Sequence, residues 1–560
     1  MAPKRSIDSA PAQEHIEEHV RTIDPAQDDT IIHDWTKLRK DANLATEDEH
    51  NTTFAQSVRR YPKAVFWSAV VTLSIVMDGY DTALMGSLFG FPAFQKTFGA
   101  EVVGSTGRYT VSAPWQMALG MANSVGNVFG IALNGLLSDR YGHKPVLLGG
   151  LASLTGLIFI QFFARSVEVL FVGQLLCGVP WGIFTTLAPA YASEVVPLVL
   201  RSYLETWVVC CWGIGQLLSY AVLFTLNDWD SRWAYRVPFG VQWVWPVLII
   251  PLAVFCPESP WWYVRKGRYD EAEKSAARLT SAPTREMARE DARKAVALMI
   301  ETNKLEEDMC HDTSYLACFQ GTDLRRTEIA CVSWGSQILT GFVIQAYAAY
   351  FFQQAGLNPK DSFKMTLGMG GLHLVCNVAS ATLTGNYGRR WLFLVGCLVL
   401  ALFMFVLGFL AIGPQNSNFG FATSAVYLVW FGVWCLTLGP LPYVINGEVS
   451  STRLRSKTLA LARGTYLALN IVNSVVSPYI LNPEWANWRG KAGFLTGGLT
   501  LVSFAWAFFR LPETGRRTFE ELDILFSEKG ITARNFGKAV IHRDGDVIRV
   551  TGPHLGNNVN

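Results

Sequence analysis

The stretch GLLSDRYGHK at residues 135–144 joins two long apolar segments, and a shortened form of it, GNYGRR, returns at residues 385–390. Two further pairs occur in the same order: Glu194 and Arg201 with Glu448 and Arg455, and Pro257-Glu258-Ser259 with Pro512-Glu513-Thr514. Three ordered matches at a nearly constant offset of about 250 residues indicate an internal duplication.

The two halves of this repeat are strongly apolar. Of the 560 residues, 50% are hydrophobic and 16% are charged, whereas soluble proteins carry about a quarter charged residues. Most of the charges lie in residues 1–63, 258–328 and 510–560. This layout excludes an ordinary soluble enzyme and a disordered chain. The net charge of +2 gives no support for a nucleic-acid partner.

The uncharged stretches have the length of membrane-spanning helices. A helix needs about 20 apolar residues to cross a bilayer, which is longer than a buried strand. We predict an all-α membrane protein with twelve transmembrane helices, six in each half: 64–86, 116–138, 145–163, 168–190, 203–225, 237–256, 329–352, 364–384, 391–413, 422–446, 458–480 and 491–510.

The charge pattern also predicts the organisation around the helices. The regions are a disordered N-terminal tail 1–63, a six-helix half 64–257, a middle loop 258–328 with short amphipathic helices, a second half 329–510 and a C-terminal tail 511–560. An even number of spans places both tails on one side of the membrane. Lys and Arg beside the spans are more frequent on that side, which predicts cytoplasmic tails and a cytoplasmic middle loop.

The repeated motifs follow the second, fourth and sixth span of each half, on the predicted cytoplasmic side. Carboxylates and guanidinium groups there can pair across helices or face helix ends and hold that side closed. The alternative is that they are surface anchors. We expect the following residues to form a cytoplasmic gate: Asp139, Arg140, Glu194, Arg201, Glu258, Arg389, Arg390, Glu448, Arg455 and Glu513.

Over nearly all of residues 60–525 the chain resembles the sugar porters of the major facilitator superfamily. The resemblance is carried by Gly79-Tyr80-Asp81, the loop from Asp139 to Lys144, Pro189 to Pro197 with Arg201, Pro257 to Trp262, and Pro512 to Glu521. Tyr61 to Ala64, Met77 to Thr82 and Cys177 to Gly182 are similar to the fungal maltose and α-glucoside permease branch. The resemblance implies the major facilitator fold with pseudo-symmetric halves, and a fungal plasma-membrane symporter of disaccharides.

Four positions depart from the family's pattern. They are Gly385-Asn386 in place of an Asp-Arg pair, Gln174 in place of a frequent Arg, Phe342-Val343 in place of a frequent Asn, and Tyr443 in place of a frequent Trp. The last two positions bear on which sugar is bound more than on the class of protein.

Asp81 is the main candidate for proton coupling. It lies in the middle of the first predicted span, with no basic residue within a turn. A charged side chain within the bilayer is costly and marks a functional position by default. In the family that the chain resembles, an acid at this position accompanies proton coupling. The alternative is a structural acid that backbone groups or a water satisfy. Asp78, nearly a turn earlier, could share the proton.

A sugar site needs amides and hydroxyls that bond the substrate's hydroxyls, together with aromatic rings that pack on its C–H face. Gln216 and Gln337 match the sugar-contacting positions of the family. The other candidates of this kind are Tyr347, Tyr443 and Asn470, with Asn473 in the same helix as Asn470. For each, the alternative is an interhelical hydrogen bond that only holds helices together.

His373 and Asn377 are four residues apart in the eighth predicted span and therefore share a helix face. By resemblance, His373 falls where related porters carry an Asn that contacts the sugar. A neutral imidazole can bond a hydroxyl, and it titrates near neutral pH. We expect both residues to contact substrate. The alternative for His373 is a satisfied interhelical donor.

The leading hypothesis is a proton-coupled symporter that imports α-glucosides, with maltose as the first candidate, by alternating access. The alternatives are a proton symporter of another sugar (a hexose, sucrose, trehalose or a β-linked disaccharide) and a non-transporting sugar receptor. We expect no enzyme activity, no cofactor and no metal site, and we expect no structural disulfide among the ten cysteines. The expected partners are sugar, protons and the lipid bilayer, with the protein acting as a monomer.

Overall fold

A computed structural model describes most of the chain beyond residue 53. The described residues are 54–101, 109–229, 231, 233–281, 284–310, 314–413, 417–451, 454–515, 517, 519–527, 531–544 and 547–551. By its contacts the chain forms two units, which we call the bundle (65–196, 201–258 and 309–560) and the loop unit (1–64, 197–200 and 259–308). The expected N-terminal tail lies mainly outside the described residues.

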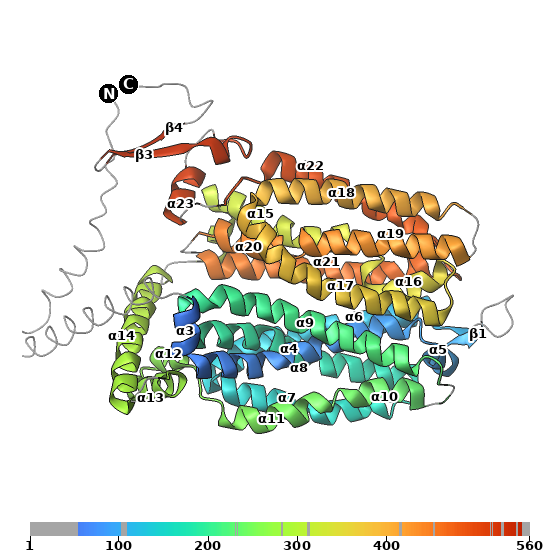
Figure 1. Cartoon of the computed structure of the whole chain (residues 1–560), viewed down its shortest axis with the longest axis horizontal. Helices are drawn as coiled ribbons and strands as arrows, with labels where there is room; N and C mark the ends of the chain where they lie inside the picture. The colour runs from blue at the N-terminus through green and yellow to red at the C-terminus, as the bar shows by residue number, and fades with distance from the viewer. Residues whose placement is uncertain are drawn as a thin grey trace, which may run out of the picture. The chain divides into compact units, whose positions relative to one another are not determined.

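The first half of the bundle consists of long helices connected by short turns (Figure 1). They are α4 (Pro62–Leu88), α6 (Ala113–Tyr141), α7 (His143–Phe162), α8 (Val167–Val195), α9 (Leu198–Leu226), α10 (Trp233–Val241) and α11 (Val244–Phe255). The short helix α5 (Pro92–Phe98) and a hairpin of β1 (Ala100–Glu101) with β2 (Tyr109–Thr110) follow α4. Each of the six spans predicted for this half has a helical counterpart.

The second half repeats this arrangement. Its elements are η1 (Tyr315–Phe319), α15 (Gly321–Thr340), η2 (Gln345–Tyr347), α16 (Ala348–Gln354), α17 (Pro359–Asn386), α18 (Arg389–Leu410), α19 (Ser417–Leu436), α20 (Leu441–Val449), α21 (Arg455–Leu481), η4 (Arg489–Lys491) and α22 (Ala492–Arg510). The six spans predicted here also have helical counterparts, although α15 begins earlier than expected.

In the described part of the chain, eight helical segments are both long and apolar enough to cross a membrane, and the bent pair of α15 with η2 and α16 makes a ninth. Three further helices, α4, α6 and α17, have 27, 29 and 28 residues, which is long enough to span. They fall short in apolar content. The arrangement is consistent with twelve spans.

Three of the predicted spans are broken, which the sequence did not predict. The first break, at Gln242 and Trp243, separates α10 from α11. The second follows Thr340, where Val343 has a φ of 74°, and the third lies just before Pro440, where α19 ends and α20 begins. Backbone groups freed at such breaks need partners inside the protein. Asn473 supplies one, because its Oδ1 accepts the N–H of Val343 at 2.8 Å.

Close packing of α6 against α8 depends on glycine. A Cβ added to Gly126 would lie 2.8 Å from the Cα of Gly178, and a Cβ on Gly178 would lie 2.6 Å from the backbone oxygen of Asn123. Small residues allow membrane helices to approach with their backbones in contact. This contact fixes the position of Asn123 within the first half.

The loop unit is helical, as expected for the middle loop, but one of its helices is long. It contains α3 (Phe54–Arg60), α12 (Pro260–Arg265), α13 (Tyr269–Leu279) and the 26-residue α14 (Arg285–Cys310). Apolar residues of α12, α13 and α14, among them Val264, Ala276 and Val296, form its core. Arg60 of α3 donates to Asp291 of α14 at 2.9 Å.

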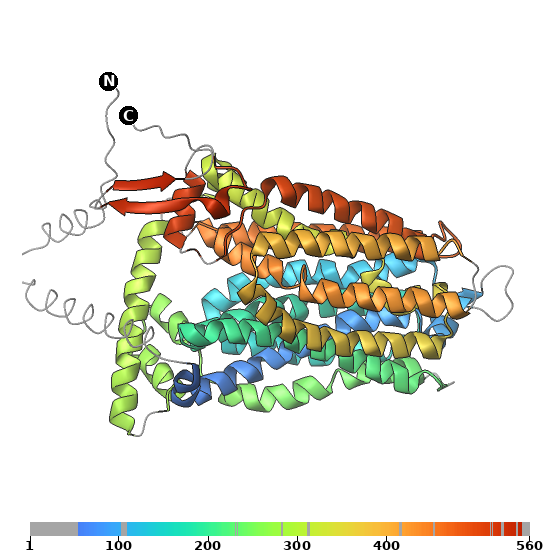
Figure 2. The ribbon, with the colours of Figure 1, turned by 45° about the horizontal axis from the view of Figure 1, so that its top comes forward.

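The chain after α22 is partly folded rather than a plain tail. It forms α23 (Phe519–Ser527), η5 (Phe536–Lys538) and an antiparallel hairpin of β3 (Val540–Asp544) with β4 (Val547–Thr551), shown in red in Figure 2. Arg326 of α15 lies 4.6 Å above the ring of Phe526, and Arg517 donates to the carbonyl oxygen of Ala539 at 2.7 Å. The first contact binds the segment to α15, and the second lies within the segment.

Candidate functional site

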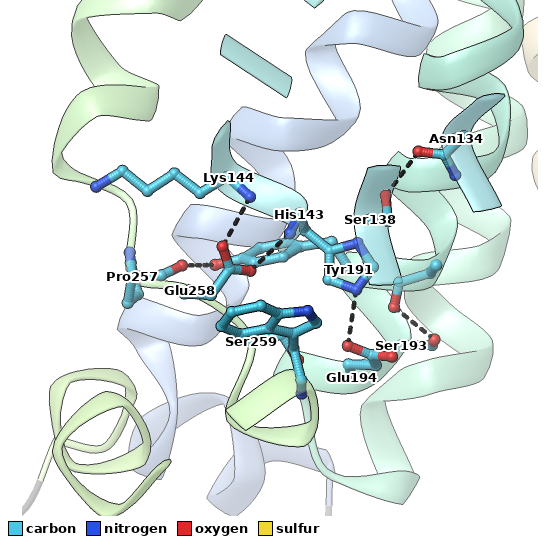
Figure 3. Close-up of polar contacts among 12 residues, drawn as sticks. Asn134, Ser138, His143, Lys144, Tyr191, Ser193, Glu194, Pro257, Glu258 and Ser259 are labelled. Atoms are coloured by element: carbon cyan, nitrogen blue, oxygen red, sulfur yellow. Dashed lines mark hydrogen bonds and ion pairs between the residues drawn. The ribbon is translucent and has the colours of Figure 1, made fainter. Parts of the chain in front are cut away.

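The sequence motifs that occur twice form the same structure twice. In the first half, the Glu258 carboxylate accepts the backbone N–H groups of His143 and Lys144 at 2.9 and 3.0 Å (Figure 3). In the second half, the Glu513 carboxylate accepts the backbone N–H groups of Arg389 and Arg390 at 2.8 and 3.1 Å. A carboxylate is favourable at a helix N-terminus, where free N–H groups point outward. Each glutamate therefore caps the third helix of its half.

In each half, the first residue of the capped helix also contacts a second glutamate through its side chain. His143 Nε2 lies 3.1 Å from Oε2 of Glu194, also visible in Figure 3. Arg389 donates from Nη2 and Nε to Oε1 of Glu448 at 2.7 and 3.1 Å. The repeat thus places an imidazole in the first half where the second half has a guanidinium. Aligning Gly142-His143-Lys144 with Gly388-Arg389-Arg390 would have revealed this pairing, but the sequence analysis did not assign His143.

Other predicted gate residues lie at the ends of the neighbouring helices. Arg390 donates to the carbonyl oxygen of Phe508 at 2.7 Å, which ties α18 to α22. Asp139 and Arg140 are exposed in the last turn of α6, and Arg140 lies 5.5 Å from the ring of Tyr141. Arg455 is exposed at the start of α21. The side chain of Arg201 lies outside the described residues.

Asp81 is fully buried in α4, and two neutral amides bind it. Asn123 Nδ2 donates to its Oδ2 and Gln242 Nε2 to its Oδ1, both at 2.7 Å. No ion pair to Asp81 occurs in the described part of the chain. Sequence reasoning found the acid but missed both amides, because Gln242 lies 161 residues away along the chain.

Asp78 lies on the same helix and has a different partner. Its Oδ2 accepts the indole N–H of Trp212 on α9 at 3.0 Å. Both carboxylates are therefore buried between helices of the first half, each with its own hydrogen-bond donors.

Two predicted sugar contacts meet across the halves. His373 Nδ1 of α17 lies 3.0 Å from Oε1 of Gln216 on α9, and the His373 ring packs 5.7 Å from that of Phe431. Asn377, one turn further along α17, is buried, and its Nδ2 has no hydrogen-bond partner among the residues that the structure describes. A buried donor without a partner is costly. The Asn377 amide is therefore available for a ligand hydroxyl.

Of the other predicted sugar contacts, Asn470 and Tyr347 touch the first half, whereas Gln337 and Tyr443 make contacts within the second half. Gln337 Nε2 donates to the carbonyl oxygen of Gly439 at the break between α19 and α20, which is the structural alternative considered for it. Asn470 Nδ2 donates to Ser124 of α6 at 3.3 Å. Tyr347 is buried, with its ring 5.8 Å from that of Phe89. Tyr443 is exposed, and its ring packs at a tilt against that of Trp334, with the ring centroids 4.6 Å apart.

The halves also touch at the end of the bundle where α5 and β1 lie, remote from α23 (Figure 1). Lys360 donates to Asp228 at 2.6 Å, and Gln353 Nε2 donates to the carbonyl oxygen of Gly90 at 2.6 Å. Among the described residues, no cluster of three or more His, Cys, Asp or Glu side chains could hold a metal ion. Nine described cysteines are free thiols.

Membrane-length helices built twice on one plan, with polar side chains between the halves, define a multi-pass membrane transporter. The chain belongs to the family described as sugar (and other) transporter, whose model matches residues 67–526. This assignment confirms the resemblance and the fold class expected from the sequence.

Curated relatives cover most of the chain. The general alpha-glucoside permease of Saccharomyces cerevisiae is 34% identical over 541 residues, which cover 95% of this chain and 87% of that protein. The maltose permease MAL31 of the same species is 35% identical over 509 residues, covering 89% and 81%. These relatives are transport proteins.

Solved structures show the same fold. The inward-open structure of the xylose transporter XylE from E. coli has a TM-score of 0.66 at 21% identity, covering 82% of this chain and 99% of that one. The XylE proton:xylose symporter bound to 6-bromo-6-deoxy-D-glucose has a TM-score of 0.64 at 21% identity, covering 83% and 100%. At this identity the likeness concerns the fold.

Proposed function

We propose that the protein is a proton-coupled symporter that imports α-glucosides, with maltose as the first substrate to test, by alternating access. The observation that carries proton coupling is Asp81, a fully buried carboxylate in the first span whose bonds come from neutral amides. A carboxylate without a cationic partner can take up a proton and become neutral inside the bilayer. The names of the curated relatives support the choice of substrate class.

The sugar site in this proposal lies between the halves. Gln216 and His373 meet there, and the unpartnered amide of Asn377 is one turn away. Amide and imidazole groups can both donate to and accept from hydroxyls, as a neutral sugar requires. Because Gln216 and His373 belong to different halves, a sugar that bonds both would join the halves.

The paired glutamate motifs form the cytoplasmic gate in this proposal. The excess of Lys and Arg beside the spans supports cytoplasmic termini. The protein acts as a monomer in the plasma membrane, because each chain contains both halves and the interface between them.

The test is uptake in a yeast strain that lacks its own maltose and hexose carriers. Cells expressing the chain should accumulate labelled maltose, and a protonophore should abolish accumulation. Glucose, sucrose and trehalose uptake measured in parallel identifies the substrate. Robust uptake that is insensitive to the protonophore would overturn proton coupling, and binding without uptake would favour a receptor.

The variant Asp81→Asn tests whether Asp81 carries the coupled proton. The variant keeps the size of the side chain and removes the titratable group, so it should keep sugar exchange and lose accumulation. Accumulation equal to that of the wild type would remove Asp81 from this role.

A further inference from the structure

The hydrogen bonds of Asp81 match only one protonation state. Each carboxylate oxygen accepts from a different amide, Oδ2 from Asn123 and Oδ1 from Gln242. A charged carboxylate is an acceptor only, and these two donors suit it. The arrangement therefore satisfies the charged form of Asp81.

When Asp81 binds a proton, one of its hydrogen-bond partners must act as an acceptor. One O–H bond forms, and the resulting hydroxyl is a donor that needs an acceptor. A buried donor without an acceptor is unfavourable, so the neutral form would be disfavoured if both partners could only donate. A Lys or Arg partner would have that limitation, because neither has an acceptor atom. An amide does not, since rotation about its last bond exchanges N–H for oxygen.

Gln242 is the amide suited to this exchange. It is fully buried, and in the described part of the chain its Oε1 has no hydrogen-bond partner. It lies at the break between α10 and α11, whereas Asn123 lies within the continuous helix α6, where that helix packs closely on α8. Rotation of the Gln242 amide therefore breaks only the bond to Asp81, and it turns the free Oε1 toward the new O–H group.

We propose that Gln242 is a positioning residue whose amide donates to Asp81 when that acid is charged and accepts from it when it is protonated. The inference rests on the proposed function, in which Asp81 takes up and releases a proton. In each state one amide atom of Gln242 lacks a partner, so both states carry a cost of the same kind and the rotation strongly favours neither. The proton comes from the aqueous phase and returns to it, and no other bond is formed or broken.

The experiment compares Gln242→Met with Gln161→Met. Methionine has a similar length and neither donates nor accepts strongly. Gln161 is the matched control, because it is also fully buried, but it donates to Gln174 rather than to Asp81. For each protein, three quantities are measured: proton-driven accumulation of the transported sugar against external pH, counterflow of that sugar in proteoliposomes, and infrared difference spectra between acidic and alkaline pH.

Gln242→Met should keep counterflow and reduce accumulation by about tenfold, which corresponds to the loss of one hydrogen bond to a charged group. The external pH of half-maximal uptake should rise by about one unit, because the charged form of Asp81 loses a stronger hydrogen bond than the protonated form does. The control should match the wild type. In the infrared spectra of the wild type, a side-chain amide band should change together with the carboxyl band of Asp81, and Gln242→Met should lack that amide change.

Two results would overturn the proposal. One is a pH profile and accumulation in Gln242→Met equal to those of the wild type, or a loss of counterflow together with accumulation, which would mark Gln242 as structural. The other is a carboxyl band in the wild type without an accompanying amide change, which would make Gln242 a fixed donor. Neither result affects the role of Asp81, which the Asp81→Asn variant tests separately.

Discussion

His143 and Arg389 occupy the same place in the two halves, yet only one of them carries a permanent charge. The backbone N–H of each binds a capping glutamate, and the side chain of each contacts a second glutamate, Glu194 or Glu448. An imidazole is a cation only when protonated, whereas a guanidinium is always charged. The two halves of the motif therefore differ in whether a permanent charge contacts the second glutamate.

Replacing His143 by Arg should remove this difference. In proteoliposomes at one fixed pH, His143→Arg should lower the maximal rate of sugar transport by about fivefold, because a permanently charged guanidinium can pair with Glu194 through two N–H groups and hold that contact more firmly. Arg389→His is the converse variant and should raise that rate. Equal maximal rates for all three proteins would contradict the prediction.

Removing a capping glutamate should destabilise the bundle. Glu513→Ala leaves the N–H groups of Arg389 and Arg390 without their acceptor, which should lower the free energy of unfolding by about 1–2 kcal/mol. Glu258→Ala should act similarly in the first half. Thermal unfolding of purified protein measures both. Glu273→Ala, at an exposed position on α13, is the control and should leave Tm unchanged; an equal drop in the control would refute the capping role.

His373→Asn should change the apparent affinity for sugar. The imidazole joins Gln216 across the halves, and an asparagine is too short to reach the same atom. We expect KM to rise by about fivefold to tenfold, the equivalent of one hydrogen bond, with a smaller effect on the maximal rate. Uptake kinetics across a range of pH provide the measurement. An unchanged KM and an unchanged pH profile would show that His373 only fills space.

Asp228→Asn should favour separation of the halves at the end of the bundle where α5 lies. The hydrogen bond from Lys360 lowers the pKa of Asp228 below its ordinary range. A lowered pKa means that the charged contact persists in mildly acidic medium and is lost only as the pH falls through that lower value. Distances between spin labels on the two halves should lengthen in the variant, and in the wild type at high salt. The same distances in both proteins would argue against a role for this pair.

The sequence was sufficient for the spans and the repeated motifs, because apolar length and charge placement are local properties. It also located Asp81, whose charge is conspicuous in an apolar helix. The amides that bind Asp81 could not be predicted from the local sequence. Gln242 stands alone in the apolar run VQWVWPVLII, and nothing near it in the chain indicates the acid that it contacts. The helix breaks were missed because Gly, Pro and β-branched residues also occur in continuous membrane helices.

The polar character of α4, α6 and α17 has a consequence for how the protein is made. Helices enter the bilayer from the translocon according to their apolar content, and acids and amides reduce that tendency. The helices that hold Asp81, Asn123 and His373 are therefore the ones that insert least readily alone. Stable insertion of each of these helices therefore requires neighbouring helices that shield its polar groups. Variants that remove those groups should be inserted and exported more efficiently, even where they no longer transport sugar.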